Sequence, residues 1–166
     1  MHAARELVTM GYQMVTGVAL VVALLGVAVG RTPWAESGLR LSRIAYGLFI
    51  VLGLLYFPEK AGFQVTSPIC EWKFDLALAV HSMTNYRHII LFTFFFLLTY
   101  AQLPGVRGAL IWSAAASMTM GLLVELAQGT TGEGHCRMRD LIPDGVGALL
   151  GASVILAGRR VTRTPS

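Results

Sequence analysis

Long runs of apolar residues, separated by short polar segments, set the pattern of this chain. The runs do not alternate with polar residues, which favours helices over the strands of a β-barrel. Five of them are candidates for membrane-spanning helices: residues 11–30, 44–57, 88–103, 108–128 and 141–157. We therefore predict an all-α fold, a polytopic transmembrane helix bundle of about five spans in a single domain over residues 1–166.

The first two runs raise questions of processing and of length. The first is long for a signal peptide and arginines follow it, so we expect a retained helix. The second has only 14 residues before Pro58, whereas a helix needs about 20 residues to cross a membrane. We expect it to end at Pro58, and to gain turns from residues 38–43 or to lie in a thinner region.

Composition supports a membrane protein and narrows its partners. Of the 166 residues, 55% are hydrophobic and only 13% are charged, about half the charged fraction of a soluble domain. The net charge of +4 lies mainly in loops and in the tail, where it suits contact with anionic lipids. Because no basic stripe with interleaved aromatic residues is present, we expect membrane lipids and no nucleic acid as partners. Such a thin bundle also suits a homodimer or an envelope partner protein.

Lysine and arginine positions predict the orientation of the spans. Two basic clusters lie close to span ends on one side of the five-span topology: Arg31, Arg40 and Arg43, and Arg159, Arg160 and Arg163. We therefore predict a cytoplasmic C-terminus. Loops 58–87 and 129–140 then lie outside the cytoplasm.

Segment 68–84 is too polar to span a membrane. Phe74, Leu78 and His81 fall on one helical stripe, and Trp72 suits the interface between lipid and water. We predict a short interfacial or re-entrant helix in this segment.

The two cysteines fall in loops that the predicted topology places in the same outer compartment. Cys70 lies in loop 58–87 and Cys136 in loop 129–140. A disulfide persists in such a compartment, so a disulfide and two independent thiols are both open. His135 beside Cys136 lacks a ligand spacing, so we expect no metal site. No nucleotide-binding or other cofactor motif is present, and we expect no cofactor.

Ionisable residues gather at the end of the fourth run and the start of the fifth. Charged side chains at membrane depth are unfavourable by roughly 2.5–3.5 kcal/mol each on insertion scales, so they are usually functional or paired. The candidates for acid or base are Glu125, Asp144 and His88, and the candidates for ligand binding are Gln128, Arg137, Arg139 and Asp140. A close carboxylate pair can exchange a proton. An arginine fork suits a phosphate or carboxylate headgroup.

Small residues predict how the fourth and fifth helices pack. Each helix has a face that combines small and polar residues. These faces are Ser117, Gly121, Glu125 and Gln128, and Asp140, Asp144, Gly147 and Gly151. Glycines let another backbone approach closely, and Gly121 suits the position opposite Gly147 and Gly151. We expect the two faces to meet and to bring Glu125 and Asp144 into one pocket.

Structural interpretations of the same residues stay open. Glu125 can form an ion pair with Arg137 or Arg139 that locks the hairpin, and His88 can be a helix-end histidine with no catalytic role. The aromatic residues of the third run are expected to face lipid: Phe92, Phe94, Phe95 and Phe96.

Residues 125–151 resemble the signature of the VanZ-like family. The matching positions read Glu125-x-x-Gln128, then Arg137, then Asp140-x-x-Pro143-Asp144-x-x-Gly147-Ala148-x-x-Gly151. His88 and Phe92 are similar to a histidine and a following aromatic in an earlier helix of the family. Two places depart from the pattern: the family usually has Asn in place of Asp144, and an Asp-Lys pair in place of Thr84 and Asn85.

The resemblance implies a bacterial integral membrane protein of the cell envelope, in the cytoplasmic membrane. The founding member of the family raises resistance to teicoplanin, a glycopeptide antibiotic. The resemblance thus implies a role in glycopeptide susceptibility, and we expect contact with a lipid or cell-wall-precursor headgroup. Two alternatives stay open: a membrane-embedded enzyme acting on a lipid phosphate, which the absence of a nucleophile motif disfavours, and a structural subunit of an envelope complex.

Overall fold

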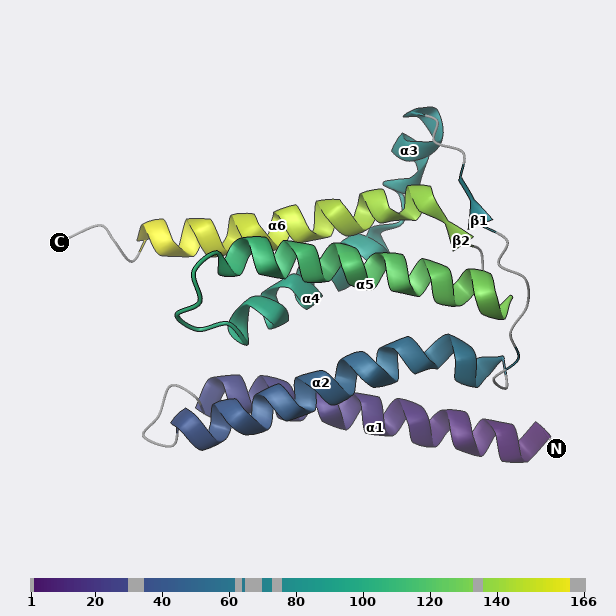
Figure 1. The fold of residues 1–166 in the computed structure, drawn as a ribbon, viewed down its shortest axis with the longest axis horizontal. Helices are drawn as coiled ribbons and strands as arrows, with labels where there is room; N and C mark the ends of the chain where they lie inside the picture. Colours follow the sequence, from purple (N-terminus) through teal and green to yellow (C-terminus); the bar gives the residue numbers. More distant parts are fainter. Residues whose placement is uncertain are drawn as a thin grey trace. The chain divides into compact units, whose positions relative to one another are not determined.

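The computed structural model describes residues 2–29, 35–61, 64, 70–72, 76–132 and 136–161. Nearly all of these residues are helical, and the all-α prediction is confirmed. The elements are α1 (His2–Val29), α2 (Ala35–Lys60), β1 (Cys70–Glu71), α3 (Leu76–Ser82), α4 (Tyr86–Ala101), α5 (Ala109–Thr131), β2 (Cys136–Arg137), the 3-10 helix η1 (Met138–Asp140) and α6 (Leu141–Val161), labelled in Figure 1.

Contacts within the chain divide it into two compact units. The first unit is Met1–Val65 and the second unit is Thr66–Ser166. The single domain over residues 1–166 stays a prediction.

The first unit is a hairpin of α1 and α2. The ring of Tyr12 lies 6.2 Å from that of Tyr56, and the Ser42 hydroxyl donates to the Ala23 carbonyl at 2.7 Å. These two pairs show that the helices run antiparallel. The α2 helix starts before residues 38–43, as the short run required, but its predicted end at Pro58 is wrong. A proline in the last turn removes only one late hydrogen bond, so α2 continues to Lys60.

Three helical segments in the described ranges are long and apolar enough to cross a membrane: Glu36–Lys60, Ala109–Thr131 and Met138–Arg160. Two apolar stretches are shorter: Tyr12–Leu25 and Tyr86–Ala101. The 16 residues of α4 extend about 24 Å, against roughly 30 Å for the hydrocarbon core. The protein is thus a membrane-embedded helical protein, and the count of five spans stays a prediction.

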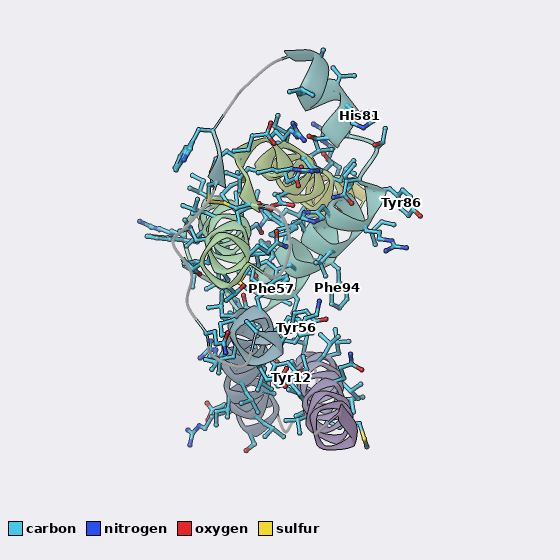
Figure 2. All side chains as sticks on the ribbon, turned by 90° about the vertical axis from the view of Figure 1, so that its right-hand side faces the viewer. Tyr12, Tyr56, Phe57, His81, Tyr86 and Phe94 are labelled. Carbon is cyan, nitrogen blue, oxygen red and sulfur yellow. A yellow bond between two sulfur atoms is a disulfide. The ribbon has the colours of Figure 1, made fainter. Side chains whose placement is uncertain are left out.

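The second unit is a bundle of α4, α5 and α6, with small elements gathered at one end (Figure 1). This end carries β1, β2, α3 and η1, and we call it the strand end. The α5 helix reaches it at Gly132, whose positive φ of 69° suits a residue without a side chain. Segment 68–84 contains β1 and the seven-residue helix α3. Figure 2 views the unit from this end, with His81 on α3. Phe74 lies outside the described residues.

In the second unit, several polar side chains are buried and several large apolar ones are exposed, which is the reverse of a soluble protein. Several of its most buried side chains are polar: Ser113, Ser117, Glu125 and Asp144. Several large apolar side chains are mostly exposed: Ile111, Trp112 and Leu149. Soluble proteins almost never bury charged groups fully unless they are paired. Lipid surroundings favour large apolar side chains outside and small or polar ones between helices.

Candidate functional site at the strand end of the second unit

A disulfide ties two distant segments together at the strand end. Cys70 and Cys136 are bonded, with their Cα atoms 4.7 Å apart, and they are paired residues of the parallel strands β1 and β2. Of the two possibilities for the cysteines, the structure contains the disulfide, drawn in yellow in Figure 2. It packs on α5 at Gly129, where an added Cβ would lie 2.8 Å from the Cys70 sulfur. The segments at Cys70 and Cys136 therefore meet at one end of the second unit.

Glu125 is 1% exposed and fastens β2 to α5. Its Oε2 accepts a hydrogen bond from the backbone N–H of Arg137 at 2.6 Å. The ion pair between Glu125 and an arginine side chain, one of the open interpretations, is therefore not the contact that forms. The disulfide at Cys136 fixes the backbone next to it, so the amide of Arg137 reaches the carboxylate and its guanidinium does not. This contact gives the buried carboxyl group a hydrogen bond and locks the hairpin by another route.

The side chains of Arg137 and Arg139 contact Glu71 instead, a residue that was not predicted from the sequence. Nη1 of Arg139 lies 3.2 Å from one carboxylate oxygen of Glu71, and Nε of Arg137 lies 3.8 Å from the other. Register explains the pairing, because Glu71 stands opposite Arg137 when Cys70 stands opposite Cys136. If the disulfide had been assumed, the sequence would thus have identified Glu71 as the residue opposite Arg137.

His88 and Asp144 form a part-buried pair between α4 and α6. Nδ1 of His88 lies 2.8 Å from Oδ1 of Asp144, with the histidine side chain 22% exposed and the aspartate 1%. Oδ2 of Asp144 is buried and has no hydrogen-bond partner in the described part of the chain. It lies against Gly121 of α5, where an added Cβ would collide with it. Gly121 therefore faces α6 as predicted, but it packs against Asp144 and not against Gly147 and Gly151.

The other two glycines predicted to pack against α5 pack against α4 instead. An added Cβ on Gly147 would lie 2.5 Å from the Ile89 carbonyl oxygen, and one on Gly151 would lie 2.7 Å from the Phe96 ring. The Thr93 hydroxyl donates to the Gly147 carbonyl at 3.0 Å across this contact. The predicted partner was therefore wrong, because spacing identifies a close-packing face without identifying the helix that covers it. The close approach of α4 and α6 is what brings His88 to Asp144.

The predicted α5 face is confirmed for three of its residues and shifts at its end. Its buried positions recur every four residues: Ser113, Ser117, Gly121, Glu125 and Gly129. Gln128 is half-buried beside that row, outside the contacts described above. Asp140, at the end of η1, is half-buried and lies close enough to Glu125 and Asp144 to interact with their charges.

The aromatic residues of α4 are mostly inside the second unit. Phe92, Phe95 and Phe96 are 3%, 6% and 0% exposed. Their predicted lipid exposure is wrong, since apolar character alone does not separate a lipid-facing ring from one under a glycine. Phe92 also contacts His88, with ring centroids 6.2 Å apart, so it supports the wall of the site.

The site therefore combines His88, Asp144 and Glu125 at its centre with Asp140 beside them and the Glu71–arginine group at its edge. No group of three or more potential metal ligands occurs among the residues that the structure describes; His135 lies outside them. Comparison with protein-family models, with curated proteins and with solved structures finds no significant match to this chain.

Proposed function

We propose that this chain is a VanZ-like integral membrane protein of a bacterial cytoplasmic membrane, and that the strand-end site engages the headgroup of a lipid or of a lipid-linked cell-wall precursor. The observation that carries the proposal is Asp144. Its carboxylate is 1% exposed, and one of its oxygens has no hydrogen-bond partner among the described residues. A buried unpaired oxygen in a membrane helix is costly, and such groups usually mark functional sites.

The disulfide supports placing the strand end outside the cytoplasm. Disulfides persist in oxidising compartments and are rare in the cytoplasm. The opposite end of the second unit suits the cytoplasmic side, where positive charge collects. There Arg159 donates a hydrogen bond to the Tyr100 hydroxyl and lies 5.5 Å above its ring.

The proposed role at the envelope is to lower susceptibility to teicoplanin-type glycopeptides. The experiment expresses the wild type in a glycopeptide-sensitive Gram-positive host and measures the inhibitory concentration of teicoplanin at matched membrane levels. Glu125→Gln keeps an oxygen that accepts the Arg137 amide but removes the charge, and Glu36→Gln removes an exposed carboxylate in the first unit as the matched control. We expect protection by the wild type and the control and none by Glu125→Gln. Full insertion with no protection by the wild type would contradict the proposal.

A second candidate, a membrane-embedded enzyme acting on a lipid phosphate, is favoured by the His88–Asp144 pair. A carboxylate that holds one histidine nitrogen orients the ring so that the other nitrogen serves as a general base. The test measures phosphate release from a lipid phosphate by purified protein, for the wild type, His88→Gln and Asp144→Asn. Activity that is lost in both variants supports this candidate. Activity unchanged by His88→Gln would exclude His88 as the base.

A further inference from the structure

Two arginine side chains converge on one carboxylate at the edge of the site. Arg139 and Arg137 approach the two oxygens of Glu71 at 3.2 and 3.8 Å. Arg137 and Glu71 are 38% and 39% exposed and Arg139 is 14% exposed, so solvent reaches the outer side of this contact. Guanidinium pairs of this kind recognise phosphates and carboxylates. The position of the Glu71 carboxylate thus marks an anion-sized place between two cations.

An apolar groove runs along α6 from the same end of the second unit. It encloses about 410 Å³ and is lined by residues of all three long helices, among them Phe96, Met118, Leu141, Gly145, Leu149 and Ala152. From Leu141 to Ala152 it extends about 16 Å along the helix at 1.5 Å per residue. Leu141 also touches the Gly121 position, so the groove adjoins the polar site.

The two features are adjacent in the chain. Arg139 precedes Leu141, which lines the groove, by two residues, so its backbone lies within about 7 Å of that end of the groove. A molecule with a long apolar chain and an anionic head matches the groove and the arginine pair at once. The groove alone calls only for an apolar chain, and the arginines alone call only for an anion. Membrane lipids with a phosphate in the headgroup have this form.

We propose that one anionic lipid binds here, with a chain in the groove and its phosphate between Arg137 and Arg139 in the place of Glu71. The inference rests on the proposed function, whose ligand class it names. Glu71 then acts as an internal competitor. Ion pairs near the surface contribute little to stability. The singly charged phosphate diester of a lipid presents two oxygens to the arginines, as the carboxylate does, so it can take the place of the carboxylate. Lipids without a phosphate gain nothing from the arginines.

The experiment uses the full chain in detergent and native mass spectrometry to count bound lipids. The protein is titrated with dioleoyl phosphatidylglycerol, and separately with dioleoylglycerol, which has the same chains and no phosphate. We expect one phosphatidylglycerol to bind about tenfold more tightly than dioleoylglycerol, since charge-assisted bonds are the strong ones. Equal affinities for the two lipids would overturn the inference.

Single substitutions test separately how the headgroup and the apolar chain of the lipid contribute to binding. Glu71→Gln should tighten phosphatidylglycerol binding several-fold and Arg137→Gln should weaken it, both at part-exposed side chains. Gly145→Leu should weaken both lipids by filling the groove, because a Cβ at Gly145 already has room, 3.6 Å from the Met118 sulfur. The exposed Arg107, replaced in Arg107→Gln, is the matched control and should change nothing.

Other outcomes contradict the inference. An unchanged affinity for phosphatidylglycerol in Glu71→Gln would show that Glu71 does not compete with the lipid. Competition by inorganic phosphate that is unaffected by Gly145→Leu shows a bare anion site with no lipid chain. The teicoplanin assay is read separately: protection without lipid selectivity overturns only this inference, and lipid selectivity without protection overturns only the proposed role at the envelope.

Discussion

Replacing Gly147 by alanine should separate α4 from α6. The added Cβ would lie 2.5 Å from the Ile89 carbonyl oxygen and 2.9 Å from the Thr93 amide nitrogen. Both neighbours are backbone atoms, so no side chain can turn aside and the two helices must move apart. Overpacking of this kind typically destabilises by about 1–3 kcal/mol. Losing the bond from the Thr93 hydroxyl adds about 0.6 kcal/mol, the average for membrane helices.

Gly145→Ala is the matched control on the same helix. Its Cβ meets only the Met118 sulfur, at 3.6 Å. Alanine is favoured over glycine in a helix by about 1 kcal/mol, and this gain applies to both variants. We expect Gly147→Ala to be less stable than Gly145→Ala by about 2–4 kcal/mol.

The assay is reversible unfolding in mixed micelles with increasing dodecyl sulfate, followed by circular dichroism. If Gly147→Ala unfolds with the same free energy as Gly145→Ala, the close backbone contact is absent and the reasoning fails. A second readout is the His88 ring signal in nuclear magnetic resonance. It should shift in Gly147→Ala and not in Gly145→Ala, since this contact sets the distance from His88 to Asp144.

Three further predictions follow from single contacts. Replacing both Cys70 and Cys136 by serine opens a 66-residue loop, which should lower the free energy of unfolding by at most about 4 kcal/mol on the chain-entropy model, measured against the wild type with and without reductant. Ser42→Ala removes the hydrogen bond to α1 and should lower the free energy of unfolding by about 0.6 kcal/mol, whereas Ser37→Ala, at an exposed position, should have no effect. Glu125→Leu should reduce the yield of folded protein through the unpaired Arg137 amide, and normal yield in that variant would remove the structural role of Glu125.

Apolar length and small-residue spacing predicted much of the fold. The four longest helices fall on predicted runs, and the row Ser117, Gly121 and Glu125 faces inward as expected. The partners of those faces were not predictable, because a glycine face fits any close helix. Gly147 thus meets α4 although the same spacing also fits α5.

Within the site, the sequence located the residues better than their contacts. His88, Glu125 and Asp144 do come together at one end of the second unit. Glu71 carried no signal of its own, because it lies outside the helical stripe predicted for segment 68–84. Its role depends on the disulfide, which sets the register that places it opposite Arg137.

The most direct test of the account asks which side of the membrane the strand end occupies. The chain has two cysteines, and both are in the disulfide, so no engineered background is needed. Intact cells are treated with a membrane-impermeant maleimide, before and after reduction with a membrane-impermeant reductant, and the labels per chain are counted by mass spectrometry. The account predicts no label before reduction and two labels after it. Labelling without reduction, or labelling only after the cells are lysed, would contradict an extracytoplasmic, disulfide-bonded site.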